Sequence, residues 1–377
     1  MQSGRPTIRT RALRRFLSVS LRPELLISAL RSFLYHSLRV ALLTVAAGGV
    51  PADAAARAEV VPFTIERAPS GGRAVQSSPP VALRFRAFGR GFRLRLEPNV
   101  SLLAPGLEAS LVDERGRRTI EVPTPWIGHG DDGSEARLSI RGHDASGYVR
   151  TPTGTFVFEP ASGGSHRVRR AEDVVADSGP VACGLEDDSE GVQAVAPVAA
   201  TAIEGEAAHD TMRVLDVSVL ADAEYYRRHG SDSVRDLVAL FNAVDGVYRS
   251  QLGITLQIAQ LVVYGTDAAQ PFSTTTSAGQ FLSELSLARK NDPLLTVGAG
   301  GVTHLLTGRT FDEKTVGMAW LKGVCDPLSG SSFTSDTAAG SPYQAAIVVA
   351  HEMGHNLGAP HDRMSGGCED APAGLIM

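Results

Sequence analysis

Beyond residue 80, the first half of the chain carries a two-residue repeat of apolar and basic side chains. Leu83 and Phe85 alternate with Arg84 and Arg86, and the same pattern returns at 92–96. A period of two predicts half-buried β-strands with a basic outer face. Further short strands are expected at three places: 119–122, 136–140 and 155–158. Residues 81–160 are therefore predicted to form a mainly β domain.

From about residue 211 the pattern changes to strands that alternate with helices. Apolar residues recur at helical spacing from Val234 to Tyr248 and from Phe281 to Ala288, which predicts two amphipathic helices. Strands are expected at four places: 215–219, 254–264, 302–306 and 315–321. This alternation predicts an α/β domain over 211–377 with a mostly parallel, twisted sheet.

Two segments show neither pattern. Residues 58–80 are rich in Pro, Ser and Gly, and residues 161–210 mix small residues with a basic and an acidic cluster, so both are predicted to be linkers. Within the second, the run from Arg167 to Arg170 is either a proteolytic processing site or an ordinary solvated surface.

The first 57 residues have the features of a targeting segment. Five arginines lie among the first fifteen residues, an apolar run at 40–50 is too short to span a bilayer, and Ala52–Ala54 offers a small-residue cleavage site. An export signal is predicted, with a disordered basic tail or a membrane anchor as alternatives. No later stretch is apolar enough for a stable membrane span, so a secreted protein is expected; high Ala, Gly and Arg suggests a bacterial source.

Composition narrows the classes of function. The chain is 43% hydrophobic and 20% charged, which is enough to build folded cores, and its net charge of -5 gives no reason to expect a nucleic-acid partner. Its three cysteines do not make a disulfide scaffold.

Three of the ten histidines fall within eleven residues near the C-terminus: His351, His355 and His361. In an α-helix, positions i and i+4 lie on one face, so His351 and His355 can direct their imidazoles at one point. Glu352 can reach a water at that point without binding the metal. Gly358 accepts the left-handed backbone at which such a helix ends, and the turn brings in His361. Three imidazoles and one open position predict one catalytic Zn2+ ion.

The start of this helix is also marked in the sequence. Ser341 is a good N-cap, Pro342 suits the first turn, and Gln344 stands at the capping-box position.

Residues 351–362 read H-E-M-G-H-N-L-G-A-P-H-D. They resemble the metzincin zinc metallopeptidases, and specifically the adamalysin (reprolysin, ADAM-like) branch. Leu305–Arg309 and Thr315–Trp320 resemble that family's central and edge strands, and Val81–Pro160 is similar to its propeptide. The resemblance implies a metzincin-type catalytic domain with a zinc helix, preceded by a mainly β propeptide domain.

The resemblance implies roles for three more residues. Cys183 resembles the family's cysteine switch, whose thiolate would occupy the open zinc position until the propeptide is removed; a free linker cysteine is the alternative. Asp362 would orient the turn after the third ligand. Met377 would be the supporting methionine of the Met-turn, so the catalytic domain is expected to be C-terminally truncated there. The family's surface Ca2+ site is doubtful, because the acidic ligand expected shortly before Leu305 is missing from Gly300, Gly301 and Val302.

These features predict a secreted zinc-dependent endopeptidase made as a zymogen. Peptide bonds of a protein or peptide substrate would be hydrolysed by a zinc-bound water with Glu352 as general base. The substrate would lie extended along the edge strand, and the chain's own propeptide would be the inhibitor. The alternatives are an inactive, truncated metalloprotease-like binding module and a non-peptidase zinc hydrolase.

Overall fold

The computed structural model describes residues 57–68, 79–178, 182–184, 193–194, 212–292, 295 and 301–361. All of the expected leader except Arg57 lies outside these ranges, as does the segment from Asp362 to Met377. Within the described residues, no helix is both long and apolar enough to cross a membrane.

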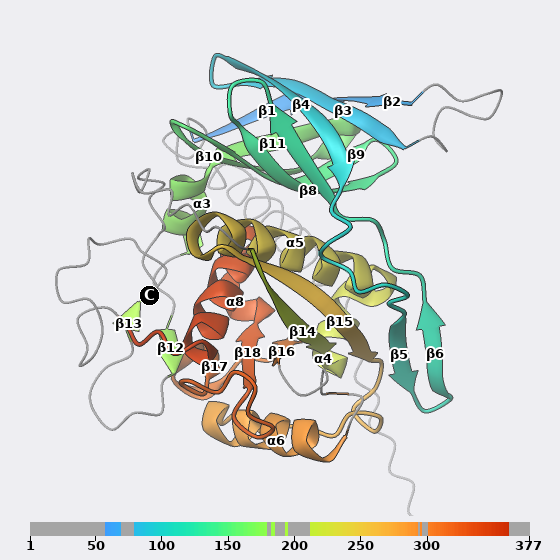
Figure 1. Cartoon of the computed structure of the whole chain (residues 1–377), viewed down its shortest axis with the longest axis vertical. Coiled ribbons are helices and arrows are strands. Elements are labelled where there is room, and N and C mark those ends of the chain that lie inside the picture. The colour runs from blue at the N-terminus through green and yellow to red at the C-terminus, as the bar shows by residue number, and fades with distance from the viewer. Residues whose placement is uncertain are drawn as a thin grey trace, which may run out of the picture. The chain divides into compact units, whose positions relative to one another are not determined.

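The first sheet is antiparallel throughout its described strands (Figure 1). In spatial order these are β1 (Ala58–Pro62), β11 (Ser165–Arg170), β10 (Gly154–Pro160), β9 (Asp144–Thr151), β8 (Glu135–Arg141), β7 (Trp126–Gly130), β4 (Arg90–Pro98), β3 (Pro80–Ala87) and β2 (Thr64–Arg67). The end strands β1 and β2 are separated in the chain only by Phe63, so the two ends of the sheet come together there. Phe63 stacks on Phe85 at 4.2 Å and on His166 at 4.0 Å. We call this sheet the β module.

Both predicted linkers need correction. The structure places β1 and β2 within 58–80, and β11 and the helix α3 (Ala171–Ser178) within 161–210. The strands β1 and β2 are held by pairing with β11 and β3, an interaction that their own short sequences do not reveal. The basic run Arg167–Arg170 lies in β11, which is paired on both sides. This pairing argues against its use as a processing site, because proteases cut exposed, unpaired segments.

The second sheet mixes parallel and antiparallel pairs. Its described strands, in order, are β13 (Gln193–Ala194), β12 (Ala182–Gly184), β17 (Thr315–Ala319), β18 (Ser331–Ser335), β16 (Val302–Thr307), β14 (Arg213–Ala221), β15 (Ile254–Tyr264), β5 (Ala109–Asp113) and β6 (Gly116–Ile120). The run β18-β16-β14-β15-β5 is parallel, and so is the pair β12–β17. The pairs β17–β18, β5–β6 and β12–β13 are antiparallel.

The β5–β6 hairpin joins the two halves of the chain. It lies in sequence between β4 and β7 of the β module, yet it pairs with β15 of the second sheet. The expected boundary of a self-contained β domain at 81–160 therefore does not coincide with the boundary between the sheets.

Helices cover both faces of the second sheet (Figure 1). On one face lie α5 (Ser233–Leu252) and α8 (Pro342–Asn356), and on the other lies α6 (Ala278–Asn291). Two shorter helices, α4 (Ala223–His229) and α7 (Asp336–Ala339), follow the strands β14 and β18. Successive strand residues face opposite sides, so Leu306 joins the core under α5 and α8 while Leu305 joins the core under α6. The helix that carries the histidine motif is thus fixed against the sheet by a continuous apolar core.

Candidate metal centre

The helix α8 begins and ends as its sequence indicates. The Ser341 hydroxyl accepts a hydrogen bond from the backbone N–H of Gln344 at 3.1 Å, and Pro342 occupies the first turn. The side-chain amide of Gln344 finds no hydrogen-bond partner among the described residues, so the reciprocal half of a capping box is not formed. Gly358, with φ of 101°, takes the left-handed backbone just beyond the helix end.

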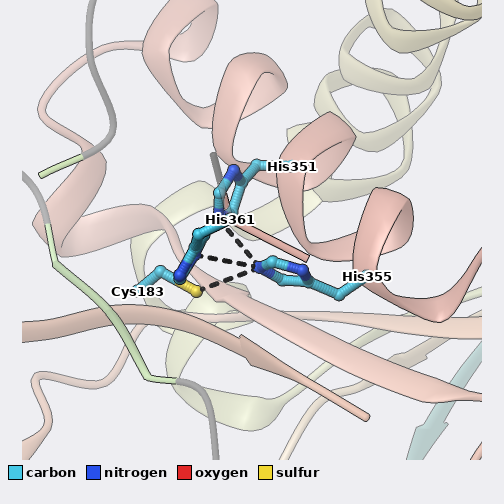
Figure 2. Close-up of side chains that lie close together, drawn as sticks. All are labelled: Cys183, His351, His355 and His361. Carbon is cyan, nitrogen blue, oxygen red and sulfur yellow. Dashed lines mark hydrogen bonds between the residues drawn. The ribbon is translucent and has the colours of Figure 1, made fainter. Parts of the chain in front are cut away.

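The three histidines of the motif converge on one point. The Nε2 atom of His355 lies 3.0 Å from that of His351 and 3.2 Å from that of His361, and the last two are 3.1 Å apart (Figure 2). All three side chains are buried. The turn at Gly358 therefore brings a residue from beyond α8 to the face formed by its i and i+4 positions.

Cys183 reaches the same point from a distant part of the chain. Its strand β12 pairs in parallel with β17, with Cys183 opposite Gly317. The sulfur lies 3.6 Å from Nε2 of His355, and the four donor atoms of Cys183, His351, His355 and His361 all lie within 4.8 Å of one another (Figure 2).

These distances fit a tetrahedral zinc ion. Three nitrogens at about 2.0–2.1 Å from one ion lie about 3.3–3.4 Å apart, and a thiolate at about 2.3 Å lies about 3.5 Å from each nitrogen. The three nitrogens, 3.0–3.2 Å apart, and the sulfur, 3.6 Å from Nε2 of His355, are close to this arrangement. Four donors of the types that zinc prefers thus surround a space that fits one ion.

The protonation states also suit a metal. His355 Nδ1 lies 2.7 Å from the Ala359 carbonyl, which fixes the N–H on Nδ1 and turns the Nε2 lone pair toward the centre. Burial lowers the pKa of His355 to about 4 and also lowers the pKa of His361, so both rings are neutral at pH 7. Neutral imidazole is the form that binds metal.

Glu352 places a carboxyl group at the edge of the centre. It is fully buried, and neither oxygen meets a clear hydrogen-bond donor among the described residues, although the Cys183 thiol lies beside it. Burial raises the pKa of Glu352 to about 8, and a bound cation would lower that pKa and favour the carboxylate form. Burial and the neighbouring Glu352 raise the pKa of the Cys183 thiol, whereas a bound cation would favour the thiolate.

The structure adds two residues that pattern reasoning did not single out as functional. Gly317 leaves the space into which Glu352 extends. Asn356, noted only as part of the family pattern, donates from Nδ2 to the carbonyls of Trp320 and Ser331 at 2.9 and 3.0 Å. Those bonds tie the end of α8 to Trp320, just after β17, and to Ser331, the first residue of β18. Neither role has a sequence signal, because both depend on segments that meet only in the fold.

The remaining candidates are accounted for as follows. His304 is a core histidine between Ser332 and Thr334, at 2.8 and 3.2 Å. Asp362 and Met377 lie outside the described residues.

A helix that presents two imidazoles and a carboxyl group beside β17 of an α/β sheet, with a third imidazole brought in from the turn beyond the helix, is the arrangement of a metal-dependent hydrolase. Comparison with known families agrees. Residues 211–377 match the family model Reprolysin_5, described as metallo-peptidase family M12. Residues 211–377 are thus similar to this family of metallopeptidases, which confirms the resemblance found in the sequence.

Proposed function

We propose that this protein is a secreted, adamalysin-like zinc endopeptidase, made as a zymogen in which Cys183 holds the metal centre closed. The observation that supports it most strongly is the convergence of three Nε2 atoms and one sulfur within 4.8 Å. Glu352 stands beside them, and the similarity to this family supplies the reaction class.

In this proposal His351, His355 and His361 hold the zinc ion. When bound, zinc supplies a Lewis acid that polarises the peptide carbonyl and lowers the pKa of water. Glu352 accepts the proton from the attacking water at its carboxylate and returns it to the nitrogen of the leaving amine. Its burial excludes bulk solvent from that proton transfer.

The substrate binds as an added strand. The edge of β17 that faces away from β18 carries β12, through the pairs Ala182↔Thr315, Cys183↔Gly317 and Gly184↔Met318. This edge therefore accepts an extended chain next to the metal centre, the recognition mode in which main-chain hydrogen bonds supply affinity. In the zymogen, β12 occupies it and Cys183 supplies the fourth ligand.

Export rests on the sequence alone. The arginine-rich start, the short apolar run at 40–50 and the small residues at 52–54 support a cleaved signal. A protease held inactive by its own chain also suits export, because the cell that makes it is protected.

The test uses the full chain with Cys183→Ser, which opens the fourth position. We expect about one zinc ion per chain by elemental analysis and hydrolysis of a quenched-peptide library. Adding Glu352→Gln should retain the zinc and abolish hydrolysis. A zinc-loaded Cys183→Ser chain that cuts no peptide would indicate a binding module. Unchanged activity of the Glu352→Gln variant would overturn the assignment of the general base.

A further inference from the structure

We infer that the β module and the β5–β6 hairpin stay bound to the metal-binding half after the chain is cut between Gly184 and Met212. Activation then requires only that β12, the strand that carries Cys183, leaves β17. The rest of the N-terminal half stays bound in the active enzyme. The consequence for latency rests on the proposed function, whereas the association itself does not.

The first support is the shared sheet. Strand β5 pairs with β15 over four residues, from Ala109↔Leu261 to Val112↔Tyr264. Just before it, Ile258 exchanges backbone hydrogen bonds with the segment 102–104, at 2.6 and 3.0 Å. Removing the N-terminal half would leave β15 as an unpaired sheet edge, a surface that proteins normally cover.

The second support is the shared core. Leu102, Ala109 and Leu111 are each at most 2% exposed, and they belong to the same apolar cluster as Phe241 of α5 and Leu256 of β15. Separating the halves would expose apolar side chains on both sides, and burial of such surface is the main driving force for association.

The third support is a buried ion pair between the β module and α5. Arg137 of β8 lies 3.4 Å from Asp245, with the two side chains 1% and 0% exposed. Asn99 also donates to Asp245, at 3.1 Å, and Asn242 donates to the carbonyl of Trp126 at 3.0 Å. Removing one partner of a buried ion pair is costly, because the other charge is left uncompensated. Dissociation would strip Asp245 of both its side-chain contacts from the N-terminal half.

These contacts lie away from the metal centre. In the second sheet, β18, β16 and β14 separate β17 from β15, so β12 and β5, which pair with β17 and β15 on opposite sides of the sheet, are independent of each other. The segment β12 is three residues long. It can leave β17 without disturbing the pairing of β5 with β15 or the Arg137–Asp245 pair. Attachment of the N-terminal half and blocking of the metal centre by Cys183 are therefore separable. A single cut after Gly184 leaves Cys183 on the N-terminal fragment, which stays attached.

The experiment inserts the recognition sequence of a site-specific protease between Pro197 and Val198 of the full chain. After complete cutting, gel filtration and native mass spectrometry should show both fragments in one species of the uncut mass. Two separate fragments would overturn the inference. Arg137→Ala should increase the dissociated fraction, and the exposed Arg93→Ala of β4 should not.

A second measurement covers the case in which Arg137→Ala does not fold. In the cut wild-type chain, the backbone amides of 261–264 should keep their protection from hydrogen exchange, because β5 still covers that edge; loss of protection on cutting would overturn the inference. Both measurements need no substrate. Associated fragments without peptidase activity in a cut Cys183→Ser chain would refute the proposed function alone.

Discussion

Gly317 on the edge strand and Glu352 on the zinc helix fit together only because residue 317 has no side chain. A β-carbon at this position would lie 2.5 Å from Oε1 of Glu352 and 2.7 Å from its Cγ. Both distances are well below van der Waals contact. Gly317 is also the residue opposite Cys183 in the β12–β17 pair, so the same position of β17 neighbours both the carboxyl group and the cysteine.

Gly317→Ala is therefore expected to displace Glu352, the proposed general base. In the Cys183→Ser background, peptide hydrolysis should fall by about 100-fold, the scale of a 1 Å misplacement of a catalytic group. Zinc content should be unchanged, since no ligand is touched. Gly91→Ala is the control, because a β-carbon at Gly91 meets no atom within 4 Å. Equal activity of the Gly317→Ala and Gly91→Ala variants would show that the contact does not position Glu352.

Cys183→Ser should release the proposed latency of the uncut chain. A hydroxyl is a much weaker zinc ligand than a thiolate, so peptide hydrolysis should rise by at least about tenfold, equivalent to ~1.4 kcal/mol. Cys325→Ser is the matched control, since Cys325 is exposed and forms no disulfide with Cys183. A Cys183→Ser chain as inactive as the uncut wild type, with zinc bound, would rule out the cysteine as the blocking group.

His361→Ala should lower the bound zinc from about one ion per chain to near zero after dialysis, because two helix histidines and a thiol are a poor site without the third imidazole. His129→Ala, which changes a half-exposed histidine that contacts Glu97 in the β module, should leave zinc content unchanged. Retention of a full equivalent by the His361→Ala variant would remove His361 from the ligand set.

His229 predicts a pH dependence of stability that is separate from the metal centre. Hydrogen bonds to Asp236 and Asp336 raise its pKa from 6.5 to about 9. Because the folded-state value is the higher one, this stabilisation is fully present below about pH 6.5 and is lost as the pH rises through about 9. Nearby Arg235 and Arg228 keep their own contacts with the same carboxylates.

The measurement is thermal unfolding of wild type and His229→Gln at pH 6, 7.5 and 9.5. The variant should have a lower Tm at pH 6, and the difference should shrink by pH 9.5. A constant difference across this range would show that the charge on His229 contributes nothing. Groups that titrate in both proteins cancel in the comparison.

Some elements could be predicted from the pattern of their own residues. The expected strand at 254–264 and the helix start at Ser341 agree with the structure, because a repeat of apolar positions or a capping side chain acts within a few residues. The sequence pattern did not predict a strand at Ser331–Ser335, where the structure has β18. Its sequence, Ser-Ser-Phe-Thr-Ser, shows no alternation, and all five residues are buried between β16 and β17. Its burial is set by those neighbours.

The sequence by itself determined the three-histidine motif with its adjacent glutamate and the similarity of residues 211–377 to the M12 metallopeptidases. Helical periodicity and one glycine bend relate those residues over eleven positions, so spacing alone predicts their convergence. Only the tertiary structure decided that Cys183 meets His355, that Gly317 makes room for Glu352, and that β5 completes the second sheet. These contacts join segments from 35 to more than 150 residues apart in the chain. Sheet pairing and core packing bring these segments together, and the residue pattern of a short segment predicts neither its pairing partner nor its packing partner.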